Sequence, residues 1–303
     1  MDNIKNKKGL SITLVFKGQS LNYGEGIGNI SELKKLTRGD GSVYTYTSRQ
    51  ALRYDIVRLG NKLFNWKYYD IVDDKQKTVQ FKKELTIKDS EEMDLFGYFR
   101  TTKTESSDTR SAAVRLSNAI SLEDYKSDMD FLNNKGLADR INEFPNLANV
   151  EQHLSYYTYT ITIDLEKIGK DEEIELSNEE KTERVNQLLD IVKILNREIR
   201  GREENLSPVF VIGGMYDINS PFFLGRIKLN GKNGEFSIDT EMLKDTTTLT
   251  IGDKSIYDDK NVGMLKNIFK NEKEIEEIFE GKTKNIEEFF KDLKEKVTEY
   301  YKA

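Results

Sequence analysis

Apolar and polar positions alternate in several parts of the chain, as expected of strands that bury one face, because side chains along a strand have a period of two. Every second residue is apolar in 10–16 and again, most clearly, in 157–165. A continuous apolar run at 208–212 predicts a fully buried strand, and the aromatic stretch 64–72 predicts another.

Two segments have the 3.6-residue period of amphipathic helices. The first is expected to begin at Ser48, whose side chain suits an N-cap, and to run through Leu63. The second begins at the capping-box pair Ser177 and Glu180 and is expected to stop at Gly201.

The order of these elements indicates the fold class. If the less regular stretch from 73 to about 153 is an insertion, the order is strand, helix, strand, strand, helix, strand, which is the ferredoxin-like pattern. A charged segment from about 262 to 301 predicts a helical tail. The sequence therefore predicts an α+β protein with a modified ferredoxin-like (RRM-like) body. RNA-binding modules are prominent among proteins of this fold, but the RNP1 signature is absent, so loops and the first helix would have to hold any RNA.

The composition of the 303-residue chain excludes several classes of protein. A hydrophobic content of 37% is enough for a core, which argues against wholesale disorder. No run of about 18 apolar residues predicts a membrane span, and no apolar stretch follows the N-terminus as in a signal peptide. Without cysteine there is no disulfide or thiol nucleophile. We expect a cytoplasmic protein with no membrane partner.

Charge is distributed unevenly along the chain. The formal net charge is −6, yet residues 1–70 carry 12 Lys/Arg against 6 Asp/Glu. Binding of a polyanion depends on the local field and not on the total charge. A basic N-terminal segment on an acidic body is therefore compatible with nucleic-acid binding.

The start of the first helix is the strongest candidate for phosphate binding. Ser48, Arg49, Gln50 and Arg53 lie within its first turns. Free N–H groups at a helix start and guanidinium groups one turn apart suit a phosphate backbone. The alternative is a capped surface helix with exposed arginines.

Two loops are weaker candidates. The glycine-rich segment 19–38 would let a ligand approach the backbone closely, but its glycines lack the spacing of a dinucleotide fingerprint and no P-loop exists. In the loop after the second helix only Arg202 and Asn205 are candidates for phosphate binding, because the negative end of the helix dipole at a C-terminus repels phosphate. A flexible surface loop and tight glycine packing are the respective alternatives.

The insertion and the single histidine add two further candidates. Met129, Phe131 and Leu132 lie in an otherwise polar segment, where they either wedge between stacked bases or form a small satellite core. His153 is a candidate general base, with a structural role as the alternative, because spacing identifies no catalytic partner. Acidic pairs such as Glu91 and Glu92 are common in a chain with 53 Asp/Glu, so no metal or cofactor is expected.

Five segments, taken in order, resemble a known family. They are Ser20–Glu25, Thr47–Arg53, Asp94–Gly97, Tyr157–Leu165 and Arg197–Gly201. Together they resemble the backbone subunit of type I CRISPR Cascade complexes in the RAMP superfamily, in particular the DevR-like proteins of subtype I-B. The resemblance covers about residues 8–240.

This resemblance implies a modified ferredoxin-like palm with inserted fingers and thumb, followed by a C-terminal helical segment. The implied boundaries are 1–66, 94–118 and 153–250 for the palm, 67–93 for the fingers, 119–152 for the thumb and 251–303 for the helical segment. Several copies would stack head to tail along the CRISPR RNA (crRNA) and hold its sugar–phosphate backbone irrespective of sequence. The bases would then pair with target DNA in antiviral defence. Further partners would be the cap, large and small Cascade subunits.

The resemblance also implies the residues that bind RNA. They are Asn22 and Gly24 of the palm loop, Ser48, Arg49, Gln50 and Arg53 of the helix start, and Arg202 and Asn205 of the later loop. Tyr23, Lys34 and Lys35 of the same glycine-rich segment are predicted to bind RNA with them. Met129 and Phe131 are the thumb wedge by position and residue type.

Two other functions remain open at this point. A metal-independent endoribonuclease of the same superfamily, which processes CRISPR transcripts, would use His153 as general base with a nearby Tyr or Lys. A purely structural protein would hold no nucleic acid. The family resemblance favours the non-catalytic subunit over both.

Overall fold

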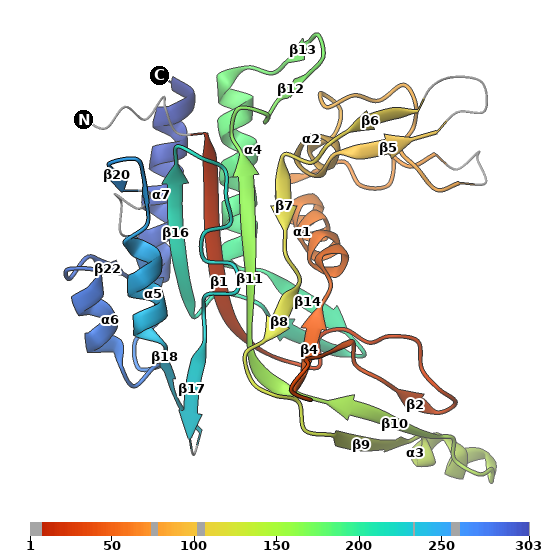
Figure 1. Cartoon of the computed structure of the whole chain (residues 1–303). Coiled ribbons are helices and arrows are strands. Elements are labelled where there is room, and N and C mark those ends of the chain that lie inside the picture. The colour runs from red at the N-terminus through yellow and green to blue at the C-terminus, as the bar shows by residue number, and fades with distance from the viewer. Residues whose placement is uncertain (1–7, 74–77, 102–106, 233, 256–260, 303) are drawn as a thin grey trace.

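A nine-stranded sheet forms the centre of the computed structural model, which describes residues 8–73, 78–101, 107–232, 234–255 and 261–302. The order of its strands is β22 (Thr283–Lys284), β21 (Val262–Met264), β16 (Phe210–Tyr216), β1 (Gly9–Gln19), β11 (Leu154–Asp164), β8 (Ala119–Ser121), β4 (Val43–Thr47) and β3 (Lys35–Thr37), with β7 (Val114–Leu116) also beside β11. Figure 1 shows β1 and β11 running side by side through the middle.

The central strands follow the alternation of the sequence. β1 is antiparallel to both β11 and β16, with Leu14 opposite Tyr159 on one side and Val211 on the other. The strands predicted at 10–16, 157–165 and 208–212 are confirmed. β1 is buried on both faces rather than one, since every residue from Gly9 to Phe16 is buried.

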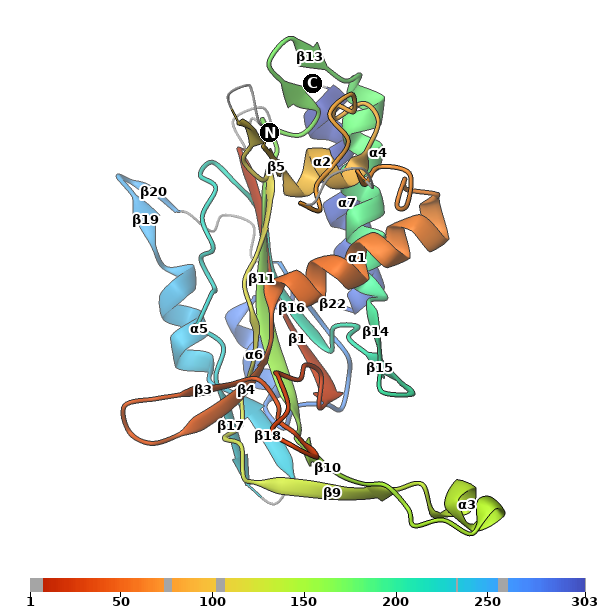
Figure 2. The same cartoon turned by 90° about the vertical axis from the view of Figure 1, so that its right-hand side faces the viewer.

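Three helices cover one face of the sheet: α1 (Arg49–Phe64), α4 (Asn178–Lys193) and α7 (Ile286–Lys302) (Figure 2). Their apolar stripes pack with Leu10 and Leu14 of β1 in one hydrophobic cluster. Both predicted helix starts are confirmed. The Ser48 hydroxyl accepts a hydrogen bond from the Ala51 amide at 3.3 Å, and Ser177 and Glu180 form a reciprocal capping box.

A second layer covers part of the opposite face. It consists of α5 (Thr240–Thr247), α6 (Glu272–Ile278) and the hairpin of β17 (Leu229–Lys232) and β18 (Glu235–Ile238). Val15, Phe210 and Ile212 point from the sheet into this second cluster. This layer explains why the polar-looking face of β1 is buried.

The strand predicted at 64–72 is wrong. After α1, Asn65 adopts a left-handed conformation and Trp66 folds back beneath Gly60, with its indole N–H donating to Gln187. Among the described residues of this region, a single isolated bridge joins Val72 to Phe81. The place beside β11 is taken by β7 and β8, which come about fifty residues later. Aromatic residues favour strands, but here burial against helices determines the conformation.

Two predictions for the second half of the chain are also wrong in part. The second helix ends at Lys193 and not at Gly201, and the chain continues as a hairpin of β14 (Asn196–Ile199) and β15 (Arg202–Asn205). Arg200 and Gly201 both have positive φ and form its turn, so the glycine serves a hairpin and not a helix cap. The tail expected to be helical contains β21 and β22 as well as α6 and α7.

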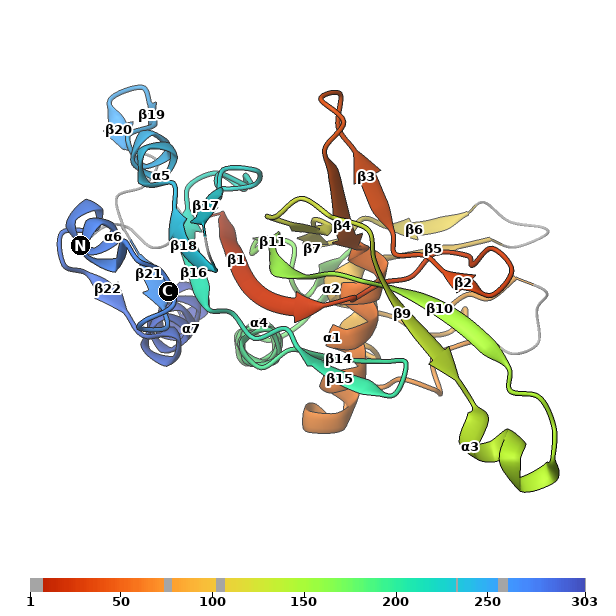
Figure 3. The same ribbon diagram turned by 90° about the horizontal axis from the view of Figure 1, so that it is seen from below.

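The remaining elements project from the body. An arm, which we call the ribbon, consists of β9 (Asp128–Asn133) and β10 (Leu147–Gln152), carries α3 (Lys135–Ala138) and a 3-10 turn (Asp139–Ile141) at its tip, and pairs with β2 (Ile30–Ser31). Figure 3 shows the ribbon reaching well beyond the sheet. The smaller elements are α2 (Glu91–Phe96), β5 (Tyr98–Arg100), β6 (Asp108–Arg110), β12 (Lys170–Asp171), β13 (Ile174–Glu175), β19 (Thr250–Ile251) and β20 (Lys254–Ser255).

Candidate nucleic-acid interface

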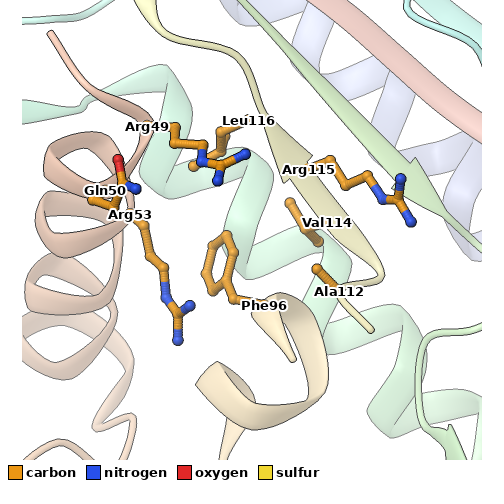
Figure 4. Close-up of a pocket in the computed structure, with 8 residues that line it drawn as sticks. All are labelled: Arg49, Gln50, Arg53, Phe96, Ala112, Val114, Arg115 and Leu116. Carbon is orange, nitrogen blue, oxygen red and sulfur yellow. The ribbon is translucent and has the colours of Figure 1, made fainter. Parts of the chain in front are cut away.

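A pocket of about 420 Å³ lies between the start of α1, the end of α2 and the strand β7; we call it the helix-start pocket. Its lining consists of Arg49, Gln50, Arg53, Phe96, Ala112, Val114, Arg115 and Leu116. None of these residues is acidic. Figure 4 shows Arg49 reaching from α1 towards β7, while the guanidinium of Arg115 turns away from the helix.

The helix start is held rigidly by neighbouring side chains. Asn22 donates to the Ser48 hydroxyl at 3.2 Å, and the Arg49 amide donates to Asn118 at 2.9 Å. The amides of Arg49 and Ala51 are therefore already engaged, whereas no described group accepts from the Gln50 amide, so this amide and the neighbouring side chains are the groups available to a phosphate.

The arginines of the helix start differ in their contacts. Arg53 donates to Glu92 through Nε at 3.0 Å and Nη2 at 2.6 Å, and its guanidinium lies 5.2 Å from the Phe96 ring centre. Within the described part of the chain, the guanidinium of Arg49 has no ion pair or hydrogen bond. Arg49 is thus the more available cation, and Arg53 would have to exchange or share its carboxylate.

The predicted palm loop packs against the base of the ribbon. Lys35 forms an ion pair with Glu151 at 2.7 Å, and the Tyr23 hydroxyl donates to the Glu151 carbonyl. Asn22 is buried, Lys34 is half-buried, and Gly24 is exposed. The loop and the helix start are joined by the bond between Asn22 and Ser48.

The later loop residues lie on the hairpin β14–β15. Arg202 donates to Gln152 at 3.4 Å and approaches Glu204 at 3.6 Å, and exposed Asn205 accepts from the Ser207 amide. Neither residue lines the helix-start pocket. The turn places Arg200, which was not predicted, 4.4 Å above the Tyr23 ring.

The ribbon exposes the predicted wedge residues. Met129 and Phe131 are 46% and 56% exposed on β9. The tip of the ribbon exposes three more apolar side chains that were not predicted as wedge residues, namely Leu137, Ile141 and Phe144. These three residues could have been predicted in the same way as Met129 and Phe131, because they too are apolar residues in an otherwise polar segment.

Arg115 is the main pocket residue missed from the sequence. It is exposed on β7 between Val114 and Leu116, which face the helix side. A three-residue alternation is too short to mark a strand without its partner.

Residues 10–232 match the family described as "CRISPR-associated negative auto-regulator DevR/Csa2". The chain belongs to this DevR/Csa2 family. The match confirms the family resemblance found in the sequence.

Solved structures similar to this DevR/Csa2 chain share its fold. One, "CRISPR RNA-guided surveillance complex, pre-nicking", has a TM-score of 0.61 at 11% identity, covering 96% of this chain and 100% of that one. Another, "CRISPR RNA-guided surveillance complex", has a TM-score of 0.57 at 13% identity, covering 96% and 98%. No curated protein sequence matches this chain.

His153 of the DevR/Csa2 chain lies inside a packed network. Its ring is buried, and Nδ1 lies 2.7 Å from the Thr45 hydroxyl, which also contacts the Tyr157 hydroxyl at 2.8 Å. Burial lowers the pKa of His153, so the ring is neutral at pH 7. A general base must reach its substrate, and here the ring contacts core residues instead.

The Asp94–Gly97 motif forms a buried anchor. The carboxylate of Asp94 accepts from Arg110 at 2.7 Å, Arg184 at 2.8 Å and the Gly169 amide at 2.9 Å. Gly97 has a φ of +68°, and a Cβ there would lie 2.3 Å from the Arg110 carbonyl oxygen. The motif therefore fixes α2, which carries Phe96 into the wall of the helix-start pocket.

The described residues contain neither a metal-binding cluster nor a membrane-spanning helix. No group of three or more His, Cys, Asp or Glu residues is placed to hold a metal ion. None of the helices that the structure describes has the length and apolar character needed to cross a bilayer.

Proposed function

We propose that the chain is a non-catalytic backbone subunit of a crRNA-guided surveillance complex of type I, subtype I-B, and that it holds the crRNA by its sugar–phosphate backbone. The observation that carries this proposal is the helix-start pocket, which presents Arg49, Gln50 and Arg115 without an acidic residue in its lining. Cationic and amide side chains bind phosphates in any sequence context, whereas sequence readout needs base-edge partners. Membership of a CRISPR-associated family supports RNA as the ligand.

The strand order supports a ferredoxin-like palm. The four strands β16, β1, β11 and β7 lie side by side and antiparallel, and α1 and α4 form the two crossovers. This is the element order strand, helix, strand, strand, helix, strand, with the second strand at 114–116. In this proposal the segment 67–93 forms the fingers and 251–303 the C-terminal segment.

The ribbon is the proposed thumb. Its exposed Met129 and Phe131 would contact bases or a neighbouring copy, and the adjoining palm loop would follow the RNA with Lys34 and Lys35. A head-to-tail contact that does not close produces a helical filament. The other proposed partners are the remaining Cascade subunits and target DNA, which pairs with the bound crRNA.

Co-expression of the chain with a CRISPR array tests the proposal. The purified particle is expected to absorb at 260 nm, to contain one crRNA, and to have a protein mass by light scattering that is a multiple of 35.1 kDa. Arg49→Glu with Arg53→Glu should release the RNA, whereas Lys62→Glu, at the far end of α1, should not. A wild-type protein that purifies as an RNA-free monomer would defeat the proposal.

A further inference from the structure

Arg115 links the helix-start pocket to a second cavity. Together with Ala112 and Leu116 it lines both the helix-start pocket and a cavity of about 290 Å³, which we call the β7 cavity. Among the described strands, β7 pairs only with β11, so its other edge is open. Because the Arg115 guanidinium turns away from α1 (Figure 4), it extends from the first pocket towards the second.

Hydroxyl groups form one wall of the β7 cavity. Thr160 and Thr162 of β11 and Ser117, which follows β7, line it together with Asn219. The Ser117 hydroxyl donates to the Asn118 carbonyl and the Thr160 hydroxyl is bonded to that of Thr13, which leaves the Thr162 hydroxyl as the available donor. Thr162 is paired with Arg115 in register, so the two side chains share a face of the sheet. Hydroxyls and guanidinium groups are donors that suit phosphate oxygens.

The charges around the β7 cavity favour an anion. The guanidinium of Arg115 has no ion pair or hydrogen bond to another described residue, and the Lys167 ammonium donates only to the hydroxyl of Ser111. Burial lowers the pKa of Lys167, and the positive charges of Arg110 and Arg115 act in the same direction. Asp164, which also lines the cavity, opposes them in part. A bound phosphate would relieve this repulsion.

We propose that the β7 cavity is a phosphate subsite, and that a single strand of nucleic acid bound at the helix-start pocket continues across the edge of β7 into it. Arg115 bridges the two sites, and Lys167 with the hydroxyl of Thr162 holds the next phosphodiester. This inference rests on the proposed RNA-binding function, because it extends the path of the same strand.

Affinity measured against salt tests the subsite. The full chain is titrated into fluorescein-labelled oligouridine RNA at several KCl concentrations, as wild type, Arg115→Gln, Lys167→Gln and the double variant. Each lost phosphate contact should lower the slope of log K against log salt by about 0.7, which corresponds to about fivefold in affinity at 0.1 M salt. Arg115→Lys should keep most of the slope, and Lys62→Gln is the control off the path.

A DNA arm and one further variant separate the outcomes. In the DNA arm, the RNA-loaded chain is titrated with labelled, non-complementary single-stranded DNA, and a loss confined to that arm assigns the subsite to DNA. If Lys167→Gln and Arg115→Gln change neither arm while Arg49→Gln weakens RNA binding, the subsite is overturned and the proposed function stands. If Arg49→Gln also has no effect, the proposed function itself fails. Unchanged melting of each single variant shows that folding is intact.

Discussion

Arginines occur in two opposite settings in this molecule. Arg110 and Arg184 are buried and converge on the fully buried carboxylate of Asp94, with additional backbone carbonyls as acceptors. Arg49 and Arg115 lie at an open pocket without a carboxylate in its lining. The same residue type therefore stabilises the fold in one region and remains available for a ligand in the other. Burial and the presence of an acidic partner decide which role an arginine takes, and neither can be read from composition.

Asp94→Ala is the largest expected perturbation of the buried setting. It leaves the buried guanidinium of Arg184 without its carboxylate and Arg110 with the more distant Asp171 at 3.3 Å, and breaking such a buried pair costs about 3–5 kcal/mol of unfolding free energy. Urea denaturation measures the loss. Glu92→Ala, which removes the partly exposed partner of Arg53, is the control and should cost less than about 1 kcal/mol. Similar losses of unfolding free energy in Asp94→Ala and Glu92→Ala would contradict the difference between the buried and the open setting.

Reversing charge in the open setting should weaken RNA binding without weakening the fold. Arg49→Glu with Arg115→Glu removes the two cations of this setting, which predicts a loss of at least about 25-fold at 0.1 M salt and a smaller salt slope. The loss should be about equal for guides of different sequence, because phosphates carry no sequence information. Fluorescence anisotropy with several unrelated RNAs measures this, and a strong dependence on guide sequence would contradict backbone readout.

The ribbon extends the comparison to exposed apolar residues. Met129→Ala with Phe131→Ala should leave the urea midpoint of the free chain nearly unchanged, since both side chains are about half exposed. Loss of stacking or docking contacts should destabilise the RNA-bound particle by about 1 kcal/mol or more. Comparison of particle size on dilution measures the effect. A fall in the stability of the free chain instead would assign these residues to a local core.

Acidification should produce the smallest effect. Burial depresses the pKa of His153 below its ordinary value of 6.5, so the stabilising contribution of the neutral ring is complete above pH 6.5. This contribution is lost as pH falls through the lower pKa of the folded state, because the unfolded chain takes up the proton first. The difference in urea midpoint between pH 7.5 and 5.5 should be smaller in His153→Gln than in the wild type. An equal difference would show that the carboxylates alone cause the acid sensitivity. In neither protein do we expect cleavage of repeat RNA.

Much of the fold could be predicted from local sequence patterns. The strands at 10–16 and 157–165 and the caps at Ser48 and Ser177 depend on periodicity and short-range hydrogen bonds, which sequence displays directly. The strand predicted at 64–72 failed because Trp66 is buried against α4, and the pattern of residues cannot reveal that partner. β7 and β8 were missed because each has three residues and is defined by pairing with β11.

The sequence by itself determined the family, the alternating core strands and the cationic start of α1. Only the tertiary structure decided which cations are available: Arg53 meets Glu92 across 39 residues, Arg110 meets Asp94, and Arg115 lies across the helix-start pocket from Arg49. It also placed the single histidine among Thr45, Tyr125 and Tyr157, where burial keeps it neutral. The physical reason is that periodicity and caps act over a few residues, whereas charge pairing and burial depend on segments brought together by the sheet.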